Sequence, residues 1–270
     1  MAAAAETTKR TWGHPGKATD IWPQPPIMSV NIGFWNVRRT GSAMNVGLQR
    51  AAELGLDIFF LGEIHIDKDR NNNLQVKKHA GYECVSSIKE GTKVAAYVAS
   101  ELMGAVEVLA EEDNLAVVKV GDIRVGGVYW QPGCRAEETE ENLEKLRWKL
   151  GGGKRVVIGD WNAHHEWWAC EGTQTNARGR QLVEWMDENG LHLGSTKGVA
   201  TQQQGNNQPS VIDLSLVSDP QQWEEGGVIA TPGEIEEEEE EHKWGMSDHH
   251  LIWGRLKAEV QRARVRKMVD

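Results

Sequence analysis

One stretch near the middle of the chain, Arg155–Ala163 with the sequence RVVIGDWNA, carries residues that could do chemistry. A short apolar run is followed by Gly159 and then by Asp160 and Asn162, which suits a buried strand that ends in polar side chains. On an extended chain Asp160 and Asn162 point to the same face. A carboxylate and an amide at a strand end suit a divalent cation, or a water molecule aimed at a phosphate. An ordinary turn is the alternative interpretation, because Asp, Asn and Gly are common turn residues.

The segment DIFFLGE at 57–63 repeats this pattern of apolar strand, glycine and acid. Hydrolysis of a phosphodiester needs a cation to neutralise charge, a water that is deprotonated and aimed in line, and a stabilised leaving oxygen. A histidine backed by a carboxylate serves either as the base or as an electrostatic partner of the phosphate. The residues near strand ends that could meet these needs are the acids Glu63, Asp160, Asp213 and Asp248, with Asn36, Tyr129, Asn162 and His249.

The composition limits the class of protein. The net charge is −10, and seven of the acids fall in the run 234–241, so any DNA contact must rely on local basic residues rather than on a global field. Three widely spaced cysteines without a CxxC pair exclude a disulfide framework and a zinc site, and favour a reducing intracellular location, nuclear or cytoplasmic. No apolar run approaches the roughly 20 residues of a membrane span, so no membrane partner is expected.

Hydrophobic periodicity divides the chain into a disordered leader (1–27), one domain (28–256) with an acidic disordered loop at about 226–242, and a basic tail or linker (257–270) that could be helical. Segment 66–81 reads as a surface loop, and Gly121-Asp122 as a hairpin turn. Strands and helices are interspersed without regular βαβ alternation, which favours mostly antiparallel sheets with helices outside. The predicted helices are 42–54, 137–150 and 177–189; the predicted strands are 28–37, 57–63, 94–99, 116–120, 123–130, 156–160 and 211–217.

Six motifs in sequence order resemble the endonuclease/exonuclease/phosphatase superfamily, which includes deoxyribonuclease I, abasic-site endonucleases and the endonuclease domains of non-LTR retrotransposons. They are WNVR (35–38), LGE (61–63), VYWQP (128–132), GDWNAHH (159–165), SVIDLSLVS (210–218) and SDHHLI (247–252). GDWNAHHEWW together with SVIDLSLVS looks most like the retrotransposon enzymes. The resemblance implies an α/β (α+β) fold, a four-layered αββα sandwich of two mostly antiparallel sheets flanked by helices.

The resemblance also implies roles for the matching residues. Metal binding is expected of Glu63 as the principal ligand, with Asn36 beside it and Asp248 near the ion. The expected catalytic roles are orientation or deprotonation of water by Asp160, hydrogen bonding of the scissile phosphate by Asn162, contact with that phosphate by His249 and Tyr129, and orientation of His249 by Asp213.

Basic and aromatic residues around these motifs are candidates for substrate contacts. Arg38, Arg178 and His165 are predicted to bind the substrate, and Arg38 stands where abasic-site enzymes commonly carry an acid, which argues against that subgroup. Trp167 could stack on DNA bases, as could Trp168, although core packing explains them equally well. Arg39, Arg180 and Lys197 are further candidate phosphate contacts, with scattered surface charge as the alternative.

The resemblance predicts a phosphodiesterase that depends on Mg²⁺, with Mn²⁺ as the alternative ion, and that nicks DNA to generate the primer for target-primed reverse transcription. A reverse-transcriptase domain in a longer polyprotein is then the expected partner. A phosphatase or RNA-directed hydrolase of the same fold, and an inactive relic that binds nucleic acid, are the alternatives.

Overall fold

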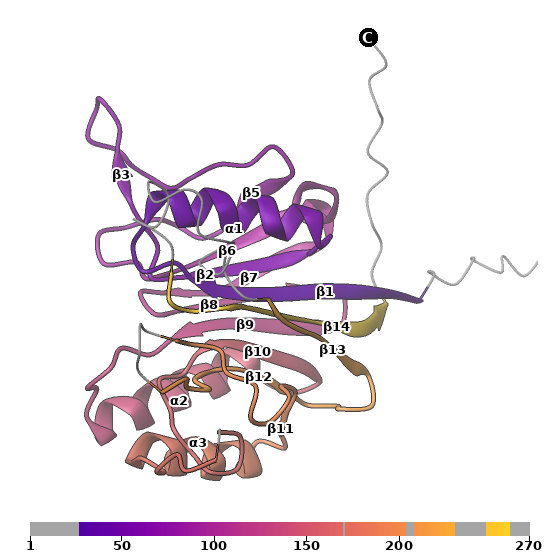
Figure 1. Ribbon diagram of the computed structural model, residues 1–270. Coiled ribbons are helices and arrows are strands. Elements are labelled where there is room, and N and C mark those ends of the chain that lie inside the picture. Colours follow the sequence, from indigo (N-terminus) through magenta and orange to yellow (C-terminus); the bar gives the residue numbers. More distant parts are fainter. Residues whose placement is uncertain (1–26, 170, 204–207, 230–246, 260–270) are drawn as a thin grey trace, which may run out of the picture.

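Two six-stranded β-sheets pack face to face in the computed structural model, with helices on their outer faces (Figure 1). The structure describes residues 27–169, 171–203, 208–229 and 247–259. The first sheet has the order β13–β14–β1–β2–β6–β5 and the second β11–β12–β10–β9–β8–β7. This arrangement confirms the predicted four-layered sandwich.

The elements lie within the following bounds. In the first sheet the strands are β1 (Ile27–Asn36), β2 (Ile58–Gly62), β5 (Tyr82–Cys84), β6 (Val94–Ala99), β13 (Trp223–Ile229) and β14 (Leu251–Glu259). In the second they are β7 (Val106–Glu112), β8 (Leu115–Val120), β9 (Ile123–Tyr129), β10 (Lys154–Asp160), β11 (His192–Leu193) and β12 (Asp213–Val217). The remaining elements are α1 (Gly41–Glu53), α2 (Ala136–Leu150), α3 (Ala177–Glu188), the 3₁₀ helix η1 (Ser100–Ala105) and a small hairpin, β3 (Asp67–Lys68) with β4 (Leu74–Gln75).

Most strand neighbours run antiparallel. Within the described residues, eight of the ten pairings in the two large sheets are antiparallel, and the β1–β2 and β9–β10 pairs are parallel. All the predicted helices and strands are present, including the hairpin at Gly121-Asp122. None of the described helices is long and apolar enough to cross a membrane.

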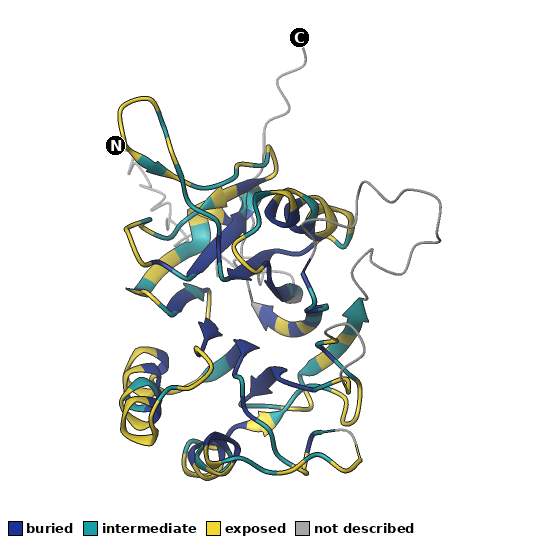
Figure 2. Ribbon diagram, turned by 60° about the vertical axis from the view of Figure 1, so that its left-hand side comes forward, coloured by how far each residue is buried: buried dark blue, intermediate teal, exposed yellow. Residues whose placement is uncertain are grey.

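The central strands are buried on both faces, which explains their uninterrupted apolar runs. In β2, Ile58 and Phe60 pack between the two sheets, whereas Phe59 and Leu61 pack on the other side with Met44 of α1 and its neighbours. This alternation is the period of two of an extended strand. Figure 2 shows buried strands at the centre of the molecule and exposed residues on the outer sides of the helices.

Tryptophans form much of the core between the second sheet and its helices. The rings of Trp130 and Trp161 meet edge to face with centroids 4.6 Å apart, and Trp185 of α3 lies 6.3 Å from Trp161. Trp168 is fully buried in the same cluster. The prediction that Trp168 could contact DNA bases is therefore wrong, because the core contains its ring.

Two predicted segment boundaries are also wrong. Residues 226–229 belong to β13, which pairs with β14, so the acidic loop does not begin at 226. The polar Glu224 and Glu225 interrupt the apolar pattern by which this edge strand could be predicted. Gly226 leaves room for a tryptophan, because a Cβ there would meet the ring of Trp253. Residues 230–242 lie outside the described part of the chain.

The predicted tail begins inside a strand. β14 continues through Glu259 and pairs with β1 as far as Ile27, so residues 257–259 are extended rather than helical. Residues 260–270, like the leader 1–26, lie outside the described residues.

Gly127 allows the two sheets to approach closely, and it gives the first testable prediction. A Cβ on Gly127 would lie 2.2 Å from the Phe60 ring of the facing sheet, whereas a Cβ on Gly126 would find its nearest atom at 3.5 Å. Gly127→Ala should therefore lower the free energy of unfolding by about 1–3 kcal/mol through overpacking. Urea unfolding measures this, with Gly126→Ala as the matched control. Equal stabilities of the two variants would contradict this packing.

Candidate active site

The direction and register of the strands bring the predicted catalytic residues to one edge of the sandwich. Asn36 and Asp160 end β1 and β10, and Glu63 directly follows β2. β12 runs antiparallel to β10 and begins at this edge, which pairs Asp213 with Asp160. Tyr129 ends β9 and pairs with Asp160 on its other side. Residues far apart in the sequence thus meet because their strands end or begin together.

The side-chain amide of Asn36 links the two sheets. Its Nδ2 donates to Asp160 Oδ2 at 2.9 Å and to Glu63 Oε1 at 3.1 Å. Its Oδ1 accepts a hydrogen bond from the backbone N–H of Arg38 at 2.9 Å, which directs both amide hydrogens toward carboxylates. Asn36 is fully buried, and its bond to Asp160 is buried with it, whereas the bond to Glu63 is partly buried. Asn36 was predicted beside the metal; here it acts as a donor to the two carboxylates.

His249 is held by Asp213 and faces Asp160. Its Nδ1 lies 2.9 Å and 3.1 Å from the two carboxylate oxygens of Asp213, and its Nε2 lies 3.8 Å from Asp160 Oδ2. Burial disfavours the charged imidazolium, but the charge and hydrogen bond of Asp213 outweigh it, with help from Asp160, and raise the pKa of His249 to about 9. His249 is therefore protonated at neutral pH, and the predicted Asp213–His249 pair is present.

The backbone around His249 is fixed as tightly as its ring. The indole N–H of Trp35 donates to the His249 carbonyl at 2.8 Å. The Ser247 hydroxyl accepts from the His249 N–H at 3.0 Å and donates to the Asn36 carbonyl. These bonds tie the SDHH motif to the end of β1, so that Asn36 and His249 keep a fixed separation.

Asp160 and Asn162 form a second fixed unit. The Asn162 N–H donates to Asp160 Oδ1 at 3.0 Å, and the Asn162 side chain donates to the Trp130 carbonyl at 2.8 Å. Asn162 has a φ of 45°, a left-handed conformation that asparagine tolerates better than most residues. Burial, followed by repulsion from Asp213, raises the pKa of Asp160 well above its usual range. A buried carboxylate with a raised pKa is a stronger base than an exposed one.

Tyr129 lies buried beside the carboxylates. Burial and the negative charge of Glu63 raise its pKa far above the usual value, so its phenol keeps its proton. A neutral phenol at this place is a hydrogen-bond donor for an incoming phosphate oxygen.

Charged side chains surround the buried centre at its rim. Arg38 Nη1 lies 3.2 Å from Asp248 Oδ1, and Arg39 Nε lies 3.6 Å from Glu63 Oε2. Both arginine side chains are exposed to solvent, so these ion pairs add little stability. Both residues also have positive φ angles. They place positive charge at the rim of the site, and the substrate role of Arg38 stays a prediction.

Two other predicted substrate contacts lie differently. Arg178 is buried, and its guanidinium donates to the backbone carbonyls of Gln131, Trp161 and Asn162. Because those bonds occupy it, Arg178 supports the loops that carry Asn162, and the prediction of a direct phosphate contact is wrong. His165 accepts from the Trp167 N–H through Nδ1, and its ring packs 5.2 Å from that of Trp168, so its visible contacts lie within its own loop.

Sequence reasoning missed two residues of the Gln- and Asn-rich segment. The Thr201 hydroxyl accepts the N–H groups of Ile212 and Asp213, at 3.1 Å and 3.0 Å, and so fixes the start of β12. Gln202 Nε2 lies 3.3 Å from Asp248 Oδ2 and 3.5 Å from His249 Nε2. A polar segment without periodicity gives no signal for such contacts, because they depend on tertiary structure.

The donor set fits a hard divalent cation. Asp160, Asp213 and His249 are close enough to share an ion, but Asp213 and His249 already bind one another. Asp248 Oδ1 is buried without a hydrogen bond and faces only the positive charges of Arg38 and His249 among the described residues. Carboxylates from Glu63, Asp160 and Asp248 are the oxygen ligands that Mg²⁺ prefers, and Mg²⁺ needs few of them because it keeps several waters.

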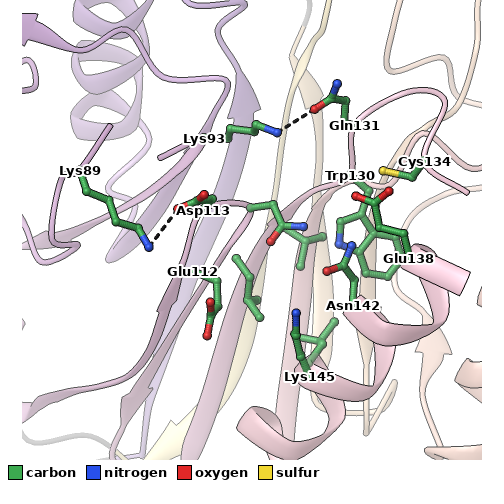
Figure 3. A pocket seen from close by; sticks show the side chains of 14 residues that line it. Lys89, Lys93, Glu112, Asp113, Trp130, Gln131, Cys134, Glu138, Asn142 and Lys145 are labelled. Atoms are coloured by element: carbon green, nitrogen blue, oxygen red, sulfur yellow. Dashed lines mark hydrogen bonds and ion pairs between the residues drawn. The ribbon is translucent and has the colours of Figure 1, made fainter. Parts of the chain in front are cut away.

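One cavity lies beside Glu63, and Lys93 lines both this cavity and a second one. The first, of about 300 Å³, is lined by Arg39, Glu63 and His65 among others. The second, of about 290 Å³, lies between the sheet and α2, and in Figure 3 the Lys93 ammonium points across it to Gln131. Lys93 Nζ donates to Gln131 Oε1 at 2.7 Å. The surface beside Glu63 is therefore hollowed and carries positive charge.

A family model described as endonuclease-reverse transcriptase matches residues 123–253, a range that includes Asp160, Asp213 and His249. Over this range the chain is similar to the endonuclease/exonuclease/phosphatase family, and its fold is that of the nucleases compared below. Glu63 and Asn36 lie outside the matched range, and the fold alone places them in the site. The sequence matches no curated protein.

Solved structures of this superfamily share the fold. The endonuclease domain of TRAS1, a telomere-specific non-LTR retrotransposon, is 20% identical with a TM-score of 0.65, over 85% of this chain and 99% of that one. The 3′-5′ exonuclease NExo from Neisseria meningitidis is 19% identical with a TM-score of 0.61, over 85% and 100%. An AP endonuclease from Archaeoglobus fulgidus is 17% identical with a TM-score of 0.58, over 83% and 98%.

The His249–Asp213 pair gives the second prediction. Asp213→Asn removes the largest influence that raises the pKa of His249, so this pKa should fall below its value of about 9. An NMR titration of the His249 ring measures the change. An unaltered titration would contradict the assigned pair.

The same pair contributes to stability in a defined pH window. Because folding raises the pKa of His249, its contribution is complete below pH 6.5 and disappears as the pH rises through about 9. Asp213→Asn should show less of this decline in unfolding free energy than the original chain.

Proposed function

We propose that this chain is a metal-dependent endonuclease that hydrolyses phosphodiester bonds and nicks one strand of DNA. The observation that carries the proposal is the His249 imidazolium, held by Asp213 at 2.9 Å and facing Asp160 at 3.8 Å. Asp160 is joined in turn to Glu63 through the Asn36 amide. A base, a cationic donor and oxygen ligands for a cation thus occupy one site, which is the set that phosphodiester hydrolysis needs.

His249 serves as the cationic partner of the phosphate. Its pKa of about 9 leaves it protonated at neutral pH, so it is not available as the general base. With Nδ1 bound to Asp213, its Nε2–H is directed toward the space beside Asp160 and can donate to a phosphate oxygen. Asp213 keeps the ring in this orientation and compensates its charge.

Asp160 serves as the base. The attacking water gives its proton to the Asp160 carboxylate as its oxygen bonds to phosphorus. The bond from phosphorus to the leaving sugar oxygen breaks, and this oxygen takes a proton from solvent water to become the hydroxyl. Asn162 has a second amide hydrogen besides the one bound to the Trp130 carbonyl, and this hydrogen with Nε2–H of His249 stabilises the charge on the phosphate. Tyr129 and Arg38 supply further donors at the rim.

Glu63 is the principal ligand in this proposal, with Asp248 near the ion. Mg²⁺ held there, or Mn²⁺ as the alternative, would neutralise charge that develops on the phosphate. Asn36 keeps Glu63 in place by its hydrogen bond and so acts as a positioning residue.

The biological substrate we propose is DNA, cut to prime reverse transcription. The description of the matching family and the likeness to the TRAS1 endonuclease domain support this proposal. A nick that leaves a 3′-hydroxyl would provide the primer for a reverse-transcriptase domain, the partner that we expect in a longer polyprotein.

A second candidate function is removal of a 3′-phosphate. It is favoured by the likeness to a Neisseria structure described as the 3′ phosphatase NExo, with a TM-score of 0.61. A duplex with a 3′-phosphate at a nick distinguishes the two functions: an enzyme of this kind releases phosphate from it faster than it nicks plasmid DNA.

Supercoiled plasmid provides the test. With Mg²⁺ the chain should convert it to relaxed circles, and EDTA should stop the conversion. Asp160→Asn and His249→Ala should each lower the rate by about 10²- to 10⁴-fold, because each removes a group that acts on the reacting phosphate. Agarose electrophoresis measures the rate, and circular dichroism checks that the variants fold.

A folded Asp160→Asn variant that nicks at the original rate would contradict the assigned base. If the folded original chain leaves plasmid intact but hydrolyses the 3′-phosphate, this site belongs to a phosphatase rather than to an endonuclease. A chain that does neither would fit the inactive relic.

A further inference from the structure

Trp167 and Lys197 form an exposed aromatic–cation pair on two loops. Lys197 Nζ lies 4.8 Å from the centroid of the Trp167 ring. Trp167 is 39% exposed and the neighbouring Val199 is 40% exposed, whereas the adjacent Trp168 is fully buried. Trp168 therefore packs in the core, whereas Trp167 lies at the surface beside the positive charge of Lys197, and Val199 of the second loop is exposed as well.

Backbone hydrogen bonds hold this pair in place. The Trp167 N–H donates to His165 Nδ1 at 3.1 Å, and the Trp168 indole donates to the Ala163 carbonyl at 3.3 Å. The two loops are joined to each other, because the Gly198 N–H donates to the Trp168 carbonyl at 2.9 Å. A surface fixed in this way loses little conformational entropy when a ligand binds.

Both loops lead directly into the catalytic set. Trp167 follows Asn162 by five residues, and Lys197 precedes Thr201, which fixes Asp213, by four. A chain advances at most about 3.8 Å per residue, so Trp167 lies within roughly 19 Å of Asn162. One DNA strand advances about 3.4 Å per nucleotide, so this distance corresponds to at most about six nucleotides of a strand bound at the site.

We propose that Trp167 and Lys197 bind a nucleotide of the DNA strand beside the scissile phosphate. The indole stacks on the base or sugar, and the Lys197 ammonium binds the backbone phosphate. The inference rests on the proposed function, since it takes DNA as the substrate. It also answers a difficulty in the composition: a chain with a net charge of −10 needs local cations with additional apolar contact to hold DNA.

Binding of a fluorescently labelled DNA duplex, followed by anisotropy in EDTA, tests the surface without cleavage. Trp167→Ala should weaken binding by about tenfold, the effect typical of one lost stacking contact. Lys197→Ala should weaken binding and reduce the slope of log K against log salt by about one, as expected for one lost phosphate contact.

The chain offers a matched control on α2. Trp148 is 77% exposed, and Arg147 lies 5.8 Å from its ring centroid, so this pair has the same chemistry in another place. Trp148→Ala and Arg147→Ala should bind the duplex like the original chain. Equal binding by the Trp167→Ala and Trp148→Ala variants would overturn the inference.

Plasmid nicking by the original chain separates the two proposals. If plasmid is nicked but Trp167→Ala binds normally, the surface is refuted and the endonuclease function stands. If plasmid is not nicked but binding depends on Trp167 and Lys197, the function fails while the surface stands. For an active enzyme, Trp167→Ala should raise KM for plasmid by a larger factor than it lowers kcat.

Discussion

One amide nitrogen holds together the two carboxylates on which the site depends. Asn36 Nδ2 donates both to Glu63 in the first sheet and to Asp160 in the second, so the site exists only while the sheets keep their separation. Packing between the sheets sets that separation, and Gly127 marks a close contact between them, since a Cβ there would meet the Phe60 ring. The geometry of the polar site therefore depends on the apolar packing, because the close packing at Gly127 helps to set the distance that the hydrogen bond from Asn36 to Asp160 spans.

The close packing of charged side chains in the site explains the shifted pKa values of His249 and Asp160. Asp160 and Asp213 are buried side by side, an arrangement that costs free energy unless positive charge compensates it. His249 supplies one positive charge inside the site, because the two carboxylates raise its pKa to about 9. Arg38 and Arg39 supply two more positive charges at the rim. Burial, followed by repulsion from Asp213, still raises the pKa of Asp160 above its usual range. A divalent cation bound by oxygen ligands would complete the compensation.

Much of this could be predicted from the sequence, because buried strands with apolar runs and helices with regular periodicity leave clear patterns. The strand ends carrying Glu63, Asp160 and Asp213 were found in that way, and the fold brings them together through register alone. The sequence pattern does not predict β13, because the polar Glu224 and Glu225 and two glycines interrupt its apolar residues. Arg178 was misassigned because a buried arginine with three carbonyl partners looks in sequence like any surface cation. Thr201 and Gln202 act through tertiary hydrogen bonds, which no local pattern encodes.

Asn36→Asp tests the central claim most directly, because it keeps the size of the side chain and replaces the amide donor with a third carboxylate. The account predicts that this variant folds but nicks supercoiled plasmid at least about 100-fold more slowly, a loss of roughly 2.7 kcal/mol of transition-state stabilisation. Its measured initial rate, set beside that of the original chain in the same Mg²⁺ buffer, decides the matter. An undiminished rate would show that the link between Glu63 and Asp160 is not what assembles the site.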